Sequence, residues 1–260
     1  MNDNELISTR LGGKDFFKTS YYKFEKFSQI KKQYLKKAPY PILDFGIGES
    51  DQMPPIAVLD ELTKQAYIYK NRVYADNGIE PFKEAAKKHL KEIYQIDCDK
   101  QHLAINHVIG AKSALCIIPF AFVSDEDVVI CTTPGYQVLP TMAKWLKGKI
   151  YEVPLTKQNQ YLPNLESIPV EIYQKTKIFL VNYPNSPTGA IATKEFYAQL
   201  LKKAKQYGFL IVNDCVYGPL TYHTEPLSIF SIPDSENYCI EVHSLSKAFN
   251  MTGFRIGFMV

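Results

Sequence analysis

The stretch that fixes the fold of this 260-residue chain runs from Tyr238 to Gly257 and reads YCIEVHSLSKAFNMTGFRIG. Its first five residues, up to Val242, have the apolar character of a buried strand, and Lys247 follows soon after them. Arg255 comes eight residues after Lys247, between two glycines. Ligands of parallel sheets bind just beyond the carboxyl ends of strands, so this stretch predicts a ligand site.

Upstream of this stretch, short apolar runs alternate with amphipathic stretches. The runs predicted as strands are 103–108, 128–131, 149–153, 178–181, 209–212 and 238–242. The stretches predicted as helices are 56–67, 81–94, 111–122, 138–146 and 194–206. Alternation with fully apolar strands is typical of a parallel sheet covered on both faces. The sequence therefore predicts an α/β fold, with a mostly parallel sheet and helices on both faces.

The first 40 residues are polar and aromatic, and they end at the proline pair Pro39-Tyr40-Pro41. Because prolines closely spaced in this way interrupt regular structure, we predict a boundary here. Residues 1–40 would form an N-terminal arm with one helix near 22–36, and residues 41–260 a separate domain.

Composition excludes several classes of protein. Thirty basic against 27 acidic residues give a net charge of +3, too balanced for a nucleic-acid-binding surface. Five cysteines without a C-x-x-C pair indicate a reducing compartment, and the five histidines lack the tight ligand spacing of a metal site. The longest apolar run, 114–123, is too short to span a bilayer, and residues 1–40 do not resemble a secretory signal. We expect a cytoplasmic protein without membrane or nucleic-acid partners.

The polar residues around Lys247 suit a covalently held ligand that carries a phosphate. A lysine that forms a Schiff base must lose its proton before it attacks a carbonyl carbon. Ser244 and Ser246 offer neutral donors, and Arg255 offers a planar fork of donors that matches a phosphate. The alternative is a turn with an exposed lysine, which a bare Ser-x-Ser-Lys pattern would favour. The arginine at matching spacing favours the ligand site.

Asp214 follows the apolar run 209–212, and Tyr217 comes three residues later. A carboxylate at the floor of a site keeps a pyridine nitrogen protonated, and a tyrosine hydroxyl can donate to a phenolate oxygen beside it. The alternative is that Asp214 caps the following turn. The residues alone leave both interpretations open.

Three more segments follow predicted strands. The loop 182–189 contains two prolines and a glycine, which would hold polar groups rigidly at a ligand. The alternative is that the loop is only a rigid connection between a strand and a helix. Gly110-Ala111-Lys112 opens a helix whose free N–H groups favour a phosphate, or it is a structural turn. Pro134-Gly135-Tyr136 places an aromatic ring where it would stack on a planar ligand or pack in the core. Signals at five strand ends together favour one ligand site.

These residues resemble those of fold-type I pyridoxal-phosphate (PLP) enzymes, and among them the class I/II aminotransferases. The matching segments occur in the family's order over residues 42–257. They are Gly46-Ile47-Gly48-Glu49, Tyr74 with Gly78, Gly110-Ala111-Lys112, Pro134-Gly135-Tyr136, Pro187-Thr188-Gly189, Asp214 with Tyr217, and Ser244-x-Ser246-Lys247 with Arg255. The resemblance implies that residues 41–260 form the PLP-binding large domain, and that the arm belongs to a small domain.

The resemblance also implies roles for these residues. Lys247 would be catalytic, holding PLP as a Schiff base and moving the proton at the substrate Cα. Asp214 would pair with the pyridine nitrogen, Tyr217 would bond the phenolate oxygen, and Tyr136 would stack on the ring. The residues that would hold the phosphate are Gly110, Ala111, Lys112, Ser244, Ser246 and Arg255, with Tyr74 reaching over from a second subunit, which implies a homodimer.

Within the family, the sequence most resembles the LL-diaminopimelate aminotransferases. The features that carry this likeness are the segment 20–24 followed by a helix, the Gly-Ile-Gly-acid segment and the Gly-Ala-Lys turn. They imply transfer of an amino group between an amino acid, such as LL-diaminopimelate, and a 2-oxo acid, in amino-acid biosynthesis. The residues that would bind substrate are Tyr22, Gly48, Lys112 and Tyr136.

The sequence departs from the family pattern at two points. The family usually has an asparagine directly before Pro-Thr-Gly, where it bonds the phenolate oxygen; here Ser186 takes that place and Asn185 precedes it. Serine is shorter but can still donate, or Asn185 substitutes for it. The family also continues beyond the position of Val260 into a small domain that carries an arginine for the substrate carboxylate. We therefore expect a fragment or truncated product.

Two alternatives to an aminotransferase remain. One is another fold-type I PLP enzyme, such as a carbon–sulfur lyase, because the same cofactor residues serve many reactions. The other is a catalytically incomplete fragment that binds PLP weakly or not at all.

Overall fold

The computed structural model describes residues 8–11, 13, 23–37, 39–41, 43–46, 48–75 and 78–260. The chain divides into two compact units, residues 1–48 and 49–260. In the smaller unit, the 3₁₀ turn η2 (Thr9–Leu11) and the helix α2 (Lys23–Leu35) are formed, and Lys31 pairs with Asp44. The two units divide after Gly48. This division does not test the domain boundary predicted at residue 40.

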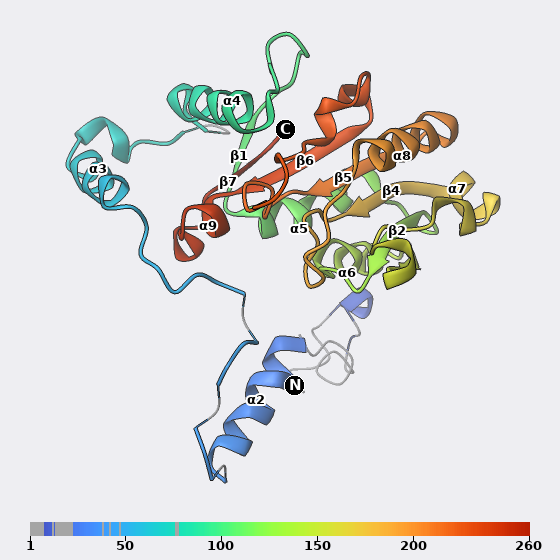
Figure 1. Cartoon of the computed structure of the whole chain (residues 1–260), viewed down its shortest axis with the longest axis horizontal. Helices are drawn as coiled ribbons and strands as arrows, with labels where there is room; N and C mark the ends of the chain where they lie inside the picture. Colours follow the sequence, from blue (N-terminus) through green and yellow to red (C-terminus); the bar gives the residue numbers. More distant parts are fainter. Residues whose placement is uncertain are drawn as a thin grey trace. The chain divides into compact units, whose positions relative to one another are not determined.

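The larger unit is built on a seven-stranded sheet in the order β1-β7-β6-β5-β4-β2-β3 (Figure 1). The strands are β1 (Asn106–Val108), β2 (Val128–Thr133), β3 (Lys149–Pro154), β4 (Thr176–Val181), β5 (Leu210–Asp214), β6 (Cys239–Ser244) and β7 (Gly257–Met259). Among these described strands, β7 is the one that runs antiparallel to its neighbours, β1 and β6. The prediction of a mostly parallel sheet in an α/β fold is confirmed.

Helices cover both faces of the sheet (Figure 1). The helices of the larger unit are α3 (Ile56–Ala66), α4 (Glu80–Tyr94), α5 (Ala111–Phe122), α6 (Val138–Trp145), α7 (Val170–Lys175), α8 (Lys194–Tyr207) and α9 (Leu245–Ala248). Short 3₁₀ turns lie at Tyr69–Arg72, Lys157–Asn159, Leu165–Ser167, Ile229–Ser231, Ser235–Asn237 and Thr252–Phe254. Helices α4, α7 and α8 pack on one face, and α5 and α6 on the other.

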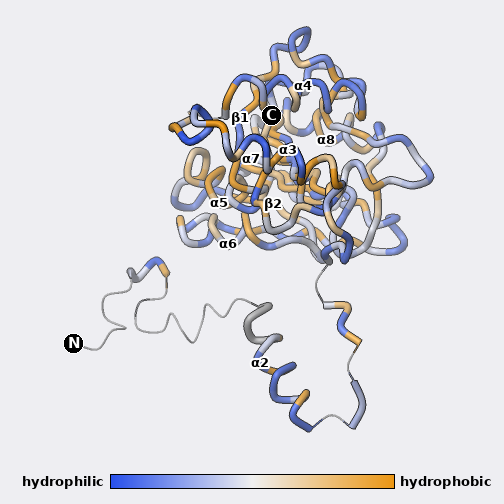
Figure 2. Tube along the Cα trace, turned by 90° about the vertical axis from the view of Figure 1, so that its left-hand side faces the viewer, coloured by the Kyte–Doolittle hydropathy of each residue, from blue (hydrophilic) through white to orange (hydrophobic). Residues whose placement is uncertain are grey.

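Each face has its own apolar core because successive side chains of a strand point to opposite sides. In β4, Phe179 packs under α8 and Ile178 packs over α5 and α6; in β5, Ile211 and Val212 divide in the same way. All four side chains are completely buried. Figure 2 shows apolar segments concentrated within the larger unit and polar segments along its loops.

Helix ends follow from local sequence. Thr193 caps α8, with its hydroxyl accepting from the Phe196 N–H at 3.1 Å, and Gly208 ends the helix in the left-handed conformation. Helix α5 starts directly after Gly110 and covers the predicted range 111–122.

The structure differs from the sequence-based expectation in several places; strand β7 and the short helix α9, for example, were not among the predicted elements. Strand β1 covers Asn106–Val108 where 103–108 was expected, because it is an edge strand whose one partner, β7, is three residues long. The short helix α7 was not expected, since six residues carry too little periodicity to be recognised. In the described part of the chain, no helix has the length and apolar character needed to cross a bilayer.

Candidate active site

Polar residues from five strand ends gather along one edge of the sheet. Asp214 ends β5, Ser244 ends β6, Asn182 follows β4 and Gly110 follows β1 by two residues. Arg255 precedes β7 by two residues. Because β7 is antiparallel, its amino end lies beside the carboxyl ends of β1 and β6. The topology therefore brings Arg255 to the edge where ligands of parallel sheets bind.

Arg255 and Gly110 form a cradle at the start of α5. Gly110 has φ +72°, and a β-carbon on it would come within 2.7 Å of Arg255 Cζ. Arg255 Nη1 donates to the Thr252 carbonyl at 2.8 Å, which fixes the guanidinium. Ala111 and Lys112 form the first turn of the 12-residue helix α5 and lie at the same place. Together these donors and the helix dipole favour an anion such as a phosphate.

Two serine hydroxyls before Lys247 are ordered by each other. Ser244 Oγ donates to Ser246 Oγ at 2.9 Å, and the Ser246 N–H donates back to Ser244 Oγ at 3.1 Å. Thr252 Oγ1 donates to the Ser246 carbonyl at 3.0 Å, so the turn that carries Arg255 is tied to the turn that carries Lys247. Both serines are buried.

Lys247 lies in α9, half-buried, with Nζ 5.7 Å from the centroid of the Tyr217 ring. Burial lowers the pKa of Lys247; the negative charge of Glu49 opposes that shift, the guanidinium of Arg255 adds to it and Asp214 opposes it. A lowered pKa increases the share of neutral amine, which is the nucleophilic form.

Asp214 both caps the turn after β5 and presents a buried carboxylate oxygen. Burial raises its pKa to about 7, although the Val216 N–H donates to the carboxylate and the Lys247 charge also favours ionisation. It therefore caps the following turn, but Oδ1 has no hydrogen-bond partner among the described residues. Asn182 Nδ2 donates to the Asp214 carbonyl at 2.7 Å and holds the strand end in place. A buried oxygen of this kind suits a ligand that donates a hydrogen bond.

The loop after β4 contributes Ser186. Asn182 Oδ1 accepts from the Ser186 N–H at 2.8 Å, and the Ser186 hydroxyl bonds the Tyr217 hydroxyl. Burial raises the pKa of Tyr217, and this hydrogen bond from Ser186 counteracts the shift. Asn185 Oδ1 is bonded within the loop by Thr188 Oγ1 at 2.8 Å. The structure thus pairs Ser186, and not the Asn185 oxygen, with Tyr217.

The other residues predicted for the site are Tyr136, Lys112, Tyr74, Gly48 and Tyr22. Tyr136, half-buried after β2, packs against the core beneath α5 and α6, and Lys112 is exposed. Tyr74 is fully exposed. Gly48 is exposed within the smaller unit, and Tyr22 lies outside the described residues.

Two polar residues at this edge, Asn182 and Glu49, were recognised in the sequence only as members of longer segments, without a role of their own. Asn182 bonds both Asp214 and Ser186. Glu49 acts electrostatically on Lys247. The signal for Asn182 was its position directly after a buried strand, which is the position that marked Asp214.

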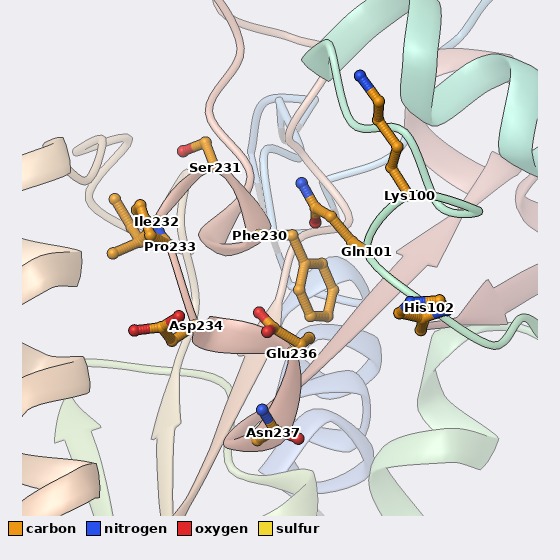
Figure 3. Close-up of a pocket in the computed structure, with 10 residues that line it drawn as sticks. All are labelled: Lys100, Gln101, His102, Phe230, Ser231, Ile232, Pro233, Asp234, Glu236 and Asn237. Carbon is orange, nitrogen blue, oxygen red and sulfur yellow. The ribbon is translucent and has the colours of Figure 1, made fainter.

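A cavity of about 550 Å³ lies elsewhere, lined by residues that include Lys100, Gln101, Phe230, Glu236 and Asn237 (Figure 3). Asn237 precedes the amino end of β6, whereas Lys247 follows its carboxyl end. The six residues of β6 span about 20 Å, so this cavity is separate from the edge that holds Lys247.

Comparison with known proteins identifies the family. The family described as "Aminotransferase class I and II" matches residues 40–260. The chain is 43% identical over 258 residues to the LL-diaminopimelate aminotransferase of Methanocaldococcus jannaschii, covering 98% of this chain and 62% of that protein. It is 35% identical over 241 residues to the enzyme of the same name from Aquifex aeolicus, covering 92% of this chain and 62% of that protein.

Solved structures agree with this likeness. Apo-BacF from Bacillus subtilis superposes with a TM-score of 0.88 at 27% identity, covering 98% of this chain and 64% of that one. Aspartate aminotransferase from Thermotoga maritima superposes with a TM-score of 0.82 at 27% identity, covering 98% and 66%. The chain thus spans about three-fifths of the length of the curated relatives it matches. On this evidence, the chain belongs to the class I and II aminotransferase family.

Proposed function

We propose that the chain is the cofactor-binding portion of a PLP-dependent aminotransferase, which moves an amino group between an amino acid and a 2-oxo acid. The observation that carries this proposal is that Asp214 and Lys247 lie at one sheet edge, near enough for each to influence the pKa of the other. One offers a buried oxygen without a partner, and the other an amine whose pKa burial lowers.

The residues present fit PLP. Its pyridinium N–H would satisfy Asp214 Oδ1, and its phosphate would meet the cradle of Gly110 and Arg255. When bound, the cofactor supplies an electron-withdrawing ring that stabilises negative charge at the substrate Cα.

Each side chain then has a defined task. Asp214 would keep the ring nitrogen protonated, Tyr217 would donate to the phenolate oxygen while Ser186 donates to the Tyr217 hydroxyl, and Tyr136 would stack on the ring. The phosphate would be bound by backbone and side-chain donors at the start of α5 and α9, namely Gly110, Ala111, Lys112, Ser244, Ser246 and Arg255.

Lys247 has two tasks. Its Nζ, whose pKa burial lowers, would hold the cofactor. The same nitrogen would carry a proton between the substrate Cα and C4′ of the cofactor.

For the substrate, we propose LL-diaminopimelate as amino donor and a 2-oxo acid as acceptor, within cytoplasmic amino-acid biosynthesis. The support is the name shared by the relatives at 43% and 35% identity. Tyr22, Gly48, Lys112 and Tyr136 would contact the substrate. Residues 1–40 would belong to the small domain and residues 41–260 to the large domain.

We further propose that the protein acts as a homodimer, with Tyr74 reaching the cofactor phosphate of the second subunit. A fully exposed tyrosine supports this assignment, as does the exposed apolar surface that Ile117, Phe120 and Phe122 form on α5. Phe120→Glu is expected to reduce self-association in analytical ultracentrifugation, whereas Lys112→Glu, also on α5, tests whether charge alone has that effect.

The test of the cofactor proposal is an absorbance spectrum of the purified chain with PLP, before and after borohydride. We expect a band that borohydride fixes covalently, and that Lys247→Ala abolishes. Lys177→Ala, an exposed lysine on β4, serves as the control and should retain the band. A band that persists in Lys247→Ala would contradict the assignment.

The same sample separates the alternative reactions. An aminotransferase shifts the spectrum when an amino acid is added alone, whereas a carbon–sulfur lyase releases pyruvate and ammonia. A wild-type chain without any lysine-dependent band would support the incomplete-fragment alternative.

A further inference from the structure

Next to the candidate active site, strands β5 and β6 carry a buried polar network centred on Glu241. Its side chain is 0% exposed, and its carboxylate accepts four hydrogen bonds. Asn213 Nδ2 at 2.8 Å and the Ile229 N–H at 2.9 Å donate to Oε2. Ser228 Oγ at 2.7 Å and His243 Nε2 at 3.0 Å bond Oε1. None of these residues has a task in the proposed reaction.

The network holds an ionised carboxylate. Burial acts to raise the pKa of Glu241, but the hydrogen bonds from His243, Ile229 and Ser228 outweigh it and lower the pKa below its usual value. A buried charge is tolerated when donors satisfy all its oxygens, and removing those donors is costly.

The same place has the composition of a metal site, because ligand atoms of Cys215, Glu241 and His243 lie within 4.8 Å of one another. Each oxygen of Glu241 is already bonded by two partners, and Cys215 Sγ lies 3.8 Å from the Tyr94 hydroxyl. These contacts describe a hydrogen-bond network that satisfies both Glu241 oxygens, although Asn213 Oδ1 has no partner among the described residues.

The network touches the two strand ends that the site requires. Asn213 directly precedes Asp214, and His243 directly precedes Ser244. Successive side chains on a strand point to opposite faces, so fixing Asn213 and His243 from one face fixes the backbone that presents Asp214 and Ser244 on the other.

Backbone contacts join the two ends as well. Asn213 lies opposite Glu241 in the β5–β6 register, and the Cys215 N–H donates to the Val242 carbonyl at 2.9 Å. Glu241 is therefore the group through which the ends of β5 and β6 are aligned by side chains.

We propose that Glu241 is a positioning residue for the cofactor site: by bonding Asn213 and His243 it sets the separation of Asp214 from the Ser244–Lys247 turn. The proposal rests on the proposed function for its consequence in PLP binding, but its structural part can be tested without cofactor.

Two substitutions separate the hydrogen bonds from the charge. In Glu241→Gln, the amide oxygen accepts from Asn213 and Ile229, and the amide nitrogen donates to Ser228 Oγ and to a neutral His243 Nε2. The network stays satisfied without a charge. In Glu241→Ala, the buried donors of Asn213 and Ile229 lose their acceptor.

The control is Tyr173→Phe. The Tyr173 hydroxyl is buried in the same core and donates to the Leu165 carbonyl at 2.9 Å, but it contacts neither strand end. This variant should lose stability without disturbing the site.

The first measurement is amide hydrogen exchange of the cofactor-free chain. We expect Glu241→Ala to speed exchange at the Cys215 and Ser246 amides about tenfold or more, while Glu241→Gln and Tyr173→Phe leave it near the wild-type rate. If Glu241→Ala does not fold, Ser228→Ala, which removes one partner, should show the same change at smaller size. Unchanged exchange in Glu241→Ala, or in Ser228→Ala where Glu241→Ala does not fold, would overturn the proposal.

The second measurement is the dissociation constant for PLP, made only if the wild type forms its lysine-dependent band. Glu241→Ala should weaken binding about tenfold or more, Glu241→Gln should restore it, and Tyr173→Phe should leave it unchanged. If Glu241→Ala and Tyr173→Phe weaken PLP binding equally, Glu241 contributes only to the general stability of the fold and does not position the site. A wild type without the band would contradict the proposed function and leave the exchange result standing.

Discussion

Gly110 and the guanidinium of Arg255 lie in direct contact, although they are far apart in the sequence of the larger unit. A β-carbon on Gly110 would come within 2.7 Å of Arg255 Cζ, and the residue also has φ +72°. Glycine is thus required here for two independent reasons, the backbone conformation and the approach of the arginine.

The first prediction uses this double requirement. Gly110→Ala should lose about 1–3 kcal/mol of stability, because φ +72° with ψ 154° is open almost only to glycine, and it should also displace Arg255 from the start of α5. The affinity for PLP or inorganic phosphate should fall, as measured by calorimetry. The control is Gly208→Ala, a left-handed residue with nothing within 4 Å, which should lose about 1 kcal/mol without a change in phosphate affinity. Equal phosphate affinities in both variants would disprove the cradle.

The second prediction concerns pH. In the folded, cofactor-free chain, burial raises the pKa of Asp214 from 3.8 to about 7. The folded state then keeps a proton that the unfolded state releases, so the free energy of unfolding should fall as pH rises from about 4 to about 7. The whole change is about 4 kcal/mol. Asp214→Asn should remove this slope in urea denaturation, and the exposed Glu171→Gln should retain it. A wild type without the slope would show that Asp214 ionises freely.

The third prediction is a coupling between Ser186 and Tyr217, whose hydroxyls share a hydrogen bond. Ser186→Ala and Tyr217→Phe should each weaken PLP binding, and together they should weaken it by less than the product of the two effects. We expect a coupling of about 1 kcal/mol in a double-mutant cycle. The pair Ser186→Ala with Thr193→Ala, at the cap of α8, should be additive. Additivity in both pairs would argue against a shared contact.

The fourth prediction concerns Asn182, which donates to the Asp214 carbonyl and accepts from the Ser186 N–H. Asn182→Ala leaves both buried backbone groups without a partner, at a cost of about 2–4 kcal/mol in the free energy of unfolding. Asn164→Ala, which removes an exposed cap contact to the Glu166 N–H, should cost about 1 kcal/mol or less. A small loss in Asn182→Ala would mean that water replaces its contacts.

Much of the fold follows from local sequence. Helix α5 covers its predicted range because an apolar run follows a glycine that adopts a conformation unsuited to a helix. Strands β2, β4 and β5 each contain an apolar run, and the strands alternate with helices along the chain. The direction of β7 was beyond sequence reasoning, because three residues carry no period and the pairing depends on β1, far away in the chain.

The site was partly predictable for the same reason. Asp214 and Lys247 could be marked because each follows an apolar strand, where ligands bind. The network around Glu241 could not be predicted. Its partners Asn213, Ser228 and His243 lie at different places in the sequence, and none of them has a distinctive pattern by itself. A charged residue within the apolar run 238–242 was the one local signal.

The antiparallel strand β7 has a consequence for how the protein is made. Gly110 meets Arg255 only after β7 has inserted between β1 and β6, so the phosphate cradle depends on contacts of very long sequence separation. At about 5–20 residues per second, a ribosome needs roughly 7–30 s to synthesise the intervening chain. During that time β1, whose partner in the sheet is β7, stays unpaired and open to other chains. High contact order of this kind slows folding, so nascent chains should depend on chaperones until β7 has emerged.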